Sequence, residues 1–137
     1  MPDANILSFD DLLRAARRQS EPQRLLFVFA GAELPDGSTD AQRARFAAGE
    51  GGALVPLMCV DKAPEELTTF AALAEESRTA GPAWSIVFVA AIAGNGGRAV
   101  TPPDADAALQ RMVAAIQAGA HQPFLPFDPT GRPVSFE

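Results

Sequence analysis

The stretch AAIAGNGGRAVT, residues 90–101, combines an apolar run, clustered glycines and an arginine, as phosphate-binding loops do. Successive glycines can turn several backbone N–H groups toward one anion, and an arginine can bind the same anion through two hydrogen bonds. We therefore identify Gly94, Asn95, Gly96, Gly97 and Arg98 as candidate ligand-binding residues. The alternative is a glycine-rich loop that only lets the chain turn.

A dinucleotide-binding motif is not supported, although Gly94, Gly96 and Ala99 match the pattern G-x-G-x-x-G/A. That motif needs a helix to begin inside it, so that the helix N-terminus meets the pyrophosphate. Pro102-Pro103 moves the expected helix start downstream, and the Gly-Lys-Ser/Thr of a Walker loop is absent. We expect at most a looser anion site, and no bound cofactor.

A second candidate site is the segment CVDKAPEEL, where an apolar run ends and a helix is expected to begin. A thiol beside a lysine and a helix N-terminus can have a lowered pKa and act as a nucleophile. Cys59, Asp61 and Lys62 are therefore a possible reactive site. The alternative is that Cys59 is a small buried apolar residue and Asp61 caps the turn into the helix.

The rest of the sequence contains no catalytic or metal-binding pattern. His121 is the one histidine, and its expected place in a loop of the other half makes it a poor base for the thiol. No cluster of His, Cys and carboxylates has metal-ligand spacing, and G-x-S-x-G is absent. We therefore expect no metal ion and favour a protein without enzymatic activity.

Composition restricts the class of protein further. The chain has 137 residues, 47% of them apolar and 20% charged, as in one globular domain. A net charge of −6 disfavours nucleic acid and anionic membranes as partners. The longest apolar run, WSIVFVAAIAG, is shorter than the ~20 residues that span a bilayer. One cysteine, and an N-terminus without signal-peptide character, predict a cytoplasmic protein.

The two halves of the chain resemble each other, which predicts an internal duplication. FDDLLRAARRQ from Phe9 matches FAALAEESRTA from Phe70, and LLFVFA from Leu25 matches IVFVAA from Ile86, both at an offset of 61. After a longer second loop the offset becomes 70, which pairs Pro56 with Pro126. The repeats span about 6–62 and 64–127, followed by a tail at 128–137.

Each repeat is expected to fold as helix, strand, helix, strand. Ser8 with Asp11 predicts the first helix cap, a second helix is expected at about 39–48, and a fourth after Pro102-Pro103. The third helix is expected to open at Pro64. The expected buried stripes are Phe9, Leu12, Leu13 and Ala16 in the first helix, Leu67, Phe70, Ala71 and Ala74 in the third, and Leu109, Met112, Val113 and Ile116 in the fourth.

The strands predict a mostly parallel α/β sheet. LLFVFA and SIVFVAAIA are continuous apolar runs, typical of central strands, whereas ALVPLMCV and PFLPF contain prolines, typical of edges or bulges. We expect a sheet with strand order 2-1-3-4, flanked by helices that form right-handed crossovers. The direction of the second strand stays open, because the 22 residues before it could be an irregular loop.

This topology predicts a crevice between the first and third strands. Ligands of parallel sheets bind beyond the carboxyl ends of the strands, where the winding direction switches. The bordering loops would be residues 30–38 and 93–103, which adds Gly31 to the candidate ligand-binding residues.

Three segments, FDDLLRAARRQSEPQRLLFVFAGAELP, GGALVPLMCVDKAPEEL and FLPFDPTGRPV, resemble a family of small uncharacterised proteobacterial proteins. Members often carry the label "ribonucleotide reductase subunit alpha". Those reductases use a radical cysteine and a redox-active cysteine pair on a far larger barrel, whereas this chain has one cysteine. ALVPLMCVDKAPEEL also resembles, more faintly, a strand-to-helix segment of SseB-like proteins. Neither resemblance implies catalytic residues.

Two functions follow from these observations. The first is a non-catalytic module that self-associates or binds a protein partner, suggested by proline-marked edge strands and an apolar tail with Phe124, Phe127 and Phe136. The tail could fold back as a hairpin or add a strand to a neighbour. The second is a binder, or a modest enzyme, for a small anionic metabolite held in the crevice by Arg98 and the glycine loop.

Overall fold

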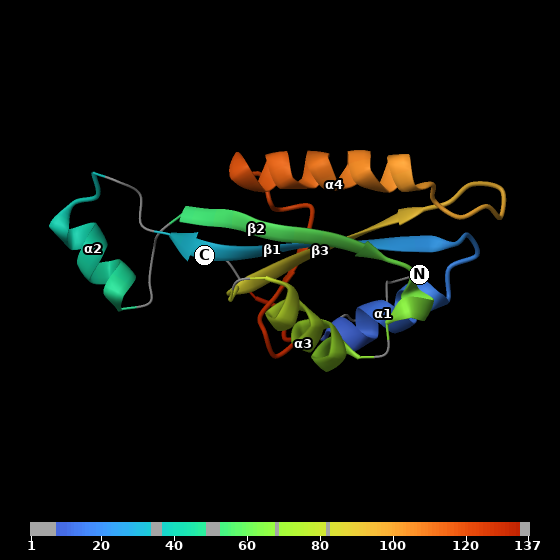
Figure 1. The fold of residues 1–137 in the computed structure, drawn as a ribbon, viewed down its shortest axis with the longest axis horizontal. Helices are drawn as coiled ribbons and strands as arrows, with labels where there is room; N and C mark the ends of the chain where they lie inside the picture. The colour runs from blue at the N-terminus through green and yellow to red at the C-terminus, as the bar shows by residue number, and fades with distance from the viewer. Residues whose placement is uncertain (1–7, 34–36, 49–52, 68, 82, 135–137) are drawn as a thin grey trace.

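The protein is a four-stranded sheet with helices on both faces (Figure 1). The computed structural model describes residues 8–33, 37–48, 53–67, 69–81 and 83–134. Helix α4 covers one face of the sheet, and α1 and α3 cover the other (Figure 1). In chain order the elements are α1 (Phe9–Arg17), β1 (Gln23–Glu33), α2 (Asp40–Ala47), β2 (Ala53–Lys62), a 3-10 turn (Pro64–Glu66), α3 (Phe70–Ala80), β3 (Ile86–Ala93), α4 (Pro102–Gln117) and β4 (Leu125–Phe127).

The strand order β2-β1-β3-β4 confirms the predicted order, but the predicted parallel pairing is wrong. β1 runs antiparallel to both β2 and β3, and β4 runs antiparallel to β3. Parallel neighbours need a crossover that returns the chain to the starting end of the sheet. No such crossover follows β1, because α2 lies beyond the end of the sheet and β2 returns alongside β1 (Figure 1). β2 and β3, which both run antiparallel to β1, are parallel to each other, and α3 connects them. The predicted right-handedness of this connection stays a prediction.

β4 also runs antiparallel to its neighbour β3, but not for the reason that applies to β2, because α4, unlike α2, covers a face of the sheet. Residues 118–124 follow α4 and contact β3 near its beginning, where the His121 ring lies 5.4 Å from the Phe88 ring. β4 then pairs over only three residues, Leu125–Phe127 against Val89–Val87. This segment, rather than the helix, sets the direction of β4.

The predicted division into central and edge strands is confirmed. β1 and β3 are central, and residues 25–30 of β1 are all buried. The proline-containing strands β2 and β4 lie at the two edges. Pro56 lies opposite Ala30, directly after a register shift between Phe29 and Ala30. Proline is therefore found at an edge and beside a bulge, where its missing N–H costs least.

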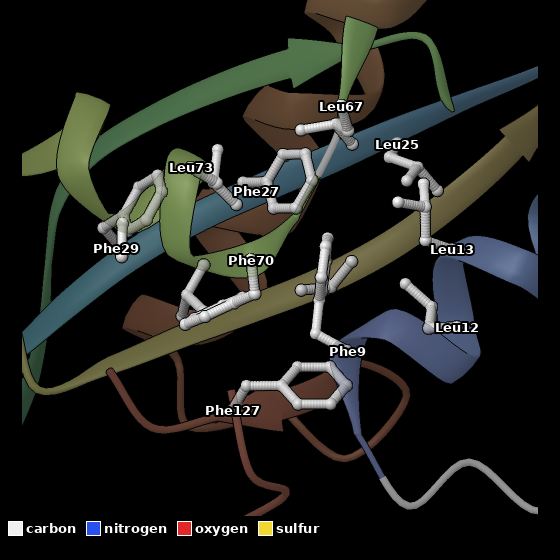
Figure 2. Close-up of a cluster of buried hydrophobic side chains, with 13 residues drawn as sticks. Phe9, Leu12, Leu13, Leu25, Phe27, Phe29, Leu67, Phe70, Leu73 and Phe127 are labelled. Atoms are coloured by element: carbon white, nitrogen blue, oxygen red, sulfur yellow. The ribbon is translucent and has the colours of Figure 1, made fainter. Parts of the chain in front are cut away.

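Two apolar cores lie on opposite faces of β1 because its side chains alternate between the faces. Figure 2 shows the core on the α1/α3 side, where Phe9 lies 5.1 Å from Phe70 and 5.8 Å from Phe127, measured between ring centroids. β1 contributes Leu25, Phe27 and Phe29 to this core and Leu26, Val28 and Ala30 to the core beneath α4.

Hydroxyl side chains cap α1, α3 and α4, as they also cap α2, at positions where the local sequence favours them. Ser8 accepts a hydrogen bond from the Asp11 N–H and begins α1, which confirms the predicted cap. Thr101 caps α4 in the same way, so Pro102 and Pro103 lie inside its first turn. α3 begins at Phe70 with Thr69 as its cap, so the predicted start at Pro64 is wrong.

The buried stripes of the helices follow from these starts. Pro64–Glu66 form a short 3-10 turn, and α3 begins only at Phe70. With this start, Ala71 lies on the exposed face of α3, so its predicted burial is wrong. The other predicted stripe residues are buried or partly buried: Phe9, Leu12, Leu13, Ala16, Leu67, Phe70, Ala74, Leu109, Met112, Val113 and Ile116.

The tail folds back on its own chain in the described residues. Asp128 and Arg132 close a turn through the Asp128 N–H and the Arg132 carbonyl, 2.9 Å apart, and Pro133 bridges to Phe127. The Phe9 N–H also donates to the Gly131 carbonyl at 3.1 Å. The hairpin alternative is thus confirmed through Val134, and the tail covers the outer edge of β4. Phe136 lies outside the described residues.

Helix α2 stands apart from the sheet (Figure 1). Thr39 and Gln42 form a reciprocal capping pair, in which each side chain accepts from the other's backbone N–H. The described side chains of α2 are exposed. The internal duplication stays a prediction: α1 and α3 share a face, as equivalent helices would, but Pro56 lies opposite Ala30 and Pro126 opposite Phe88, which are not equivalent at an offset of 61.

Phe127→Ala should lower the free energy of unfolding by about 3–5 kcal/mol, because Phe127 is 1% exposed and packs on Phe9. Leu125→Ala, in the same strand but 40% exposed, should cost less than about 1 kcal/mol. Urea unfolding measures both values. Equal losses would show that the tail is not part of the core.

Candidate functional site

The predicted crevice between the loops after β1 and β3 does not form. Because β1 and β3 are antiparallel, their carboxyl ends lie at opposite ends of the sheet. Gly31 belongs to β1, where it is buried opposite Val55. A Cβ there would lie 3.1 Å from the Leu57 side chain, so close packing against β2 explains this glycine. Gly31 is therefore separated from the other candidate ligand-binding residues.

Those other residues, Asn95 to Arg98, form a tight two-residue hairpin turn. Asn95 and Arg98 exchange both backbone hydrogen bonds at 3.1 Å. Gly96 and Gly97 have φ of +60° and +78°, the left-handed region that such a turn requires at both central positions. Turning the chain is thus a sufficient reason for two of the three glycines.

The third glycine and one of the turn's amides also have structural partners. A Cβ on Gly94 would lie 1.8 Å from the Arg98 carbonyl oxygen, so no side chain fits there. The Gly97 N–H donates to the Glu21 carboxylate at 2.8 Å, and the Gly94 N–H donates to the Pro22 carbonyl at 2.7 Å. The chain's own carboxylate thus occupies the amide that the sequence assigned to a bound anion.

A cleft lies beside this turn, between the end of β3 and the first half of α4, and we call it the α4 cleft. Its volume is about 620 Å³, within the 300–1,000 Å³ of common ligand pockets. Ile92 and Ala93 come from β3, Arg98 from the turn and Arg111 from α4. Asp104, Ala107, Ala108 and Arg111 recur at helical spacing, so one face of α4 borders the cleft.

Sequence reasoning identified Arg98 and missed Arg111. The signal that would have found Arg111 is the helical spacing of α4, which places Ala107 and Ala108 on the same face as Asp104 and Arg111. Within the described residues, neither Arg98 nor Arg111 forms a side-chain hydrogen bond or an ion pair, whereas Arg24 pairs with both Asp61 and Glu66. The cleft therefore has two guanidinium groups available to a ligand.

The proposed thiol site is not assembled as a nucleophile. Cys59 pairs with Val28, whose side chain lies in the core on the α4 side, whereas Lys62 alternates to the other face and forms an ion pair with Glu76 at 3.0 Å. Partial burial, then the carboxylates of Asp106 and Asp61, raise the pKa of the Cys59 thiol. Cys59 is exposed rather than buried, so neither alternative from the sequence describes it.

A smaller groove of about 280 Å³ runs between β2 and α3, and we call it the β2 groove. Its lining is mainly apolar, with Ser77 and Glu76 as polar members. The residues that line it are Phe29, Met58, Cys59, Val60, Leu73, Glu76, Ser77 and Ala80. Because β2 is an edge strand, this groove lies beside an edge to which another strand can be added.

The predicted apolar tail patch is not a surface feature in the described residues. Phe127 is buried in the core, and Phe124 packs against the core beneath α4. No helix of the described chain is long and apolar enough to cross a bilayer. Across the same residues, no group of three or more His, Cys, Asp or Glu side chains could hold a metal ion.

Gly94→Ala should destabilise the protein by more than about 1 kcal/mol, because the added Cβ collides with the Arg98 carbonyl. Gly96→Asn should be close to neutral, since Asn tolerates a positive φ and no atom lies within 4 Å of the Cβ position. Urea unfolding of both variants measures this difference. Equal effects would contradict the hairpin geometry.

Alkylation of Cys59 by iodoacetamide at neutral pH should be slower in the folded protein than in urea, because a raised pKa leaves less thiolate. Asp106→Asn removes a charge that opposes the thiolate, so the pKa should fall and the pH–rate profile should shift to lower pH. Asp104→Asn, on the same helix, is the control. An unchanged profile for Asp106→Asn would contradict the assigned cause.

No protein-family model, curated protein or solved structure matches the chain. The resemblance to the proteobacterial family therefore stays an expectation, and function must be inferred from the geometry described above.

Proposed function

We propose that the chain is a self-association module in which β2 pairs with β2 of a second copy. The observation that carries this proposal is the different treatment of the two sheet edges. The tail covers the outer edge of β4, whereas no strand among the described residues pairs with the outer edge of β2. β2 spans ten residues, Ala53–Lys62, and uncovered edges of that length are templates for further strands.

The side chains along β2 support this mode of association. Met58 and Val60 pack only partly against the α1/α3 core and line the β2 groove with Leu73 and Ala80 of α3. A strand added beside β2 would place alternate side chains at this groove while its backbone pairs with the edge. Edge pairing would therefore bury apolar surface that one copy leaves partly exposed.

A second copy is the favoured partner because β2 is complementary to itself. If two β2 strands pair antiparallel about an axis at Cys59, Met58 lies opposite Val60 of the second copy. Asp61 and Lys62 then lie opposite Leu57 and Pro56, so no like charges are directly opposed. Pro56 cannot donate a hydrogen bond and marks the end of the pairing stretch.

The cellular setting belongs to this proposal. One cysteine among 137 residues indicates a reducing compartment, so we place the assembly in the cytoplasm. A net charge of −6 on each copy disfavours nucleic acid as an additional partner. The like charges of two copies repel each other at low salt. Because salt screens this repulsion, the dimer should be more stable at physiological ionic strength than at low salt.

Oxidation at alkaline pH should cross-link the wild-type protein into a disulfide-linked dimer through Cys59. Directly opposed residues of antiparallel strands have Cα atoms about 4.5–5.5 Å apart, within the range that disulfides bridge. Alkaline pH is needed because the pKa of the thiol is raised. As the control, Cys59→Ser combined with Ala114→Cys moves the thiol to an exposed position on α4 and should not cross-link above background.

Charge substitutions at Cys59 test whether β2 pairs with β2 of a second copy or with a different partner. Cys59→Glu and Cys59→Lys each place two like charges opposite each other at the dimer axis and should weaken the dimer up to about fivefold. An equal mixture of the two variants places opposite charges there and should restore the affinity of the dimer. Sedimentation equilibrium measures all three. Monomers at high concentration, or weakening that the mixture does not reverse, would overturn β2 self-pairing.

A further inference from the structure

We propose that the α4 cleft binds a small organic anion with one oxyanion group and a compact apolar body. This site is independent of the β2 edge: it lies between β3 and α4, whereas the β2 groove lies between β2 and α3. In the ligand complex, Arg98 and Arg111 hold the oxyanion, and the apolar body lies against Ile92 and the alanines of α4.

The space for the ligand arises from small residues on both walls. On α4 the cleft is lined by Ala107 and Ala108, and on the β3 side by Ala93 and Gly94. Ala108 is 7% exposed and belongs to the core beneath α4, whereas Ala107 is exposed at the cleft. Larger side chains at these positions would fill the cleft, so the small size of the residues present keeps it open.

The charges in the cleft favour one oxyanion. Arg98 and Arg111 both line it, and guanidinium groups bind phosphate or carboxylate through paired hydrogen bonds. Arg14 and Arg78 instead pair with carboxylates on their own helices, and Arg24 pairs across strands. The chain has a net charge of −6, so attraction of an anion must come from local groups such as these.

Two carboxylates determine where the oxyanion lies. Asp104 is in the first turn of α4, where its charge offsets the positive end of the helix dipole. Glu21 occupies the Gly97 N–H of the turn. We therefore assign the oxyanion to the arginines rather than to the helix N-terminus or the Gly97 N–H. Asp104 lies seven residues, or about 10 Å along the helix, from Arg111 and favours a hydroxyl or amino group at the other end of the ligand.

The experiment is a titration of the ¹⁵N-labelled protein, followed by ¹H–¹⁵N NMR, with phenyl phosphate, benzoate, inorganic phosphate and phenol. We expect saturable shifts at Ile92, Arg98, Ala107 and Arg111 with phenyl phosphate or benzoate, and weaker binding of inorganic phosphate and phenol. Whichever aromatic anion binds more tightly identifies the natural ligand as a phosphate ester or a carboxylate.

Two pairs of variants test the two halves of the site. Arg111→Gln should weaken binding about tenfold or more, whereas Arg78→Gln, on α3, should leave it unchanged. Ala107→Leu should abolish binding by filling the cleft, whereas Ala114→Leu, exposed on α4 outside the cleft, should not. All four positions are exposed, and unchanged thermal unfolding verifies the fold.

Three results would overturn this proposal. The first is the absence of saturable shifts in the cleft with either aromatic anion. The second is binding that survives Ala107→Leu, which would place the anion outside the cleft. The third is inorganic phosphate binding as tightly as phenyl phosphate, which would reduce the site to exposed charge without an apolar subsite.

Discussion

The structure depends on one strand, β1, being buried on both faces while it pairs antiparallel with two neighbours. Residues 25–30 alternate between the two cores, so this strand connects the α1/α3 layer to the α4 layer, and β3 does the same with Val87, Phe88 and Val89. Both central hydrogen-bond ladders also use β1. The central position of β1 therefore buries these six side chains and also gives the backbone N–H and C=O groups of β1 hydrogen-bond partners on both sides.

The direction of β1 relative to β3 also decides where ligands can bind. In a parallel sheet the glycine turn and the residues after β1 would have met at one edge, but here they lie at opposite ends. The turn instead faces α4, because α4 follows it directly in the chain. The cleft thus combines a strand end, a hairpin turn and a helix face that are contiguous over residues 92–111.

The two edges of the sheet give the molecule its asymmetry. Phe127 anchors the tail in the core, which brings Pro133 alongside β4. Among the described residues, nothing comparable pairs with the outer edge of β2. α2, one of the helices expected to flank the sheet, lies beyond its end instead. One surface is thus suited to strand pairing and another, on the opposite face, to an anion.

The sequence by itself determined several features that depend on local chemistry. Continuous apolar runs identified β1 and β3 as central, Pro56 and Pro126 identified the edges, and Ser8 identified the start of α1. These features follow from side-chain burial, the missing proline N–H and local capping, none of which requires knowledge of distant contacts. The hairpin of the tail was one of two alternatives that Asp128 and Gly131 allowed.

Strand direction and the composition of the site were decided only by the tertiary structure. An apolar strand has the same residue pattern whether its neighbour is parallel or antiparallel, so the choice depends on where α2 and residues 118–124 carry the chain. Arg111 joins Arg98 only because α4 packs against the sheet in one rotational setting. The glycines were ambiguous for a related reason: a turn and an anion cradle both need left-handed backbone, and only the position of the Glu21 carboxylate shows which partner the Gly97 amide has.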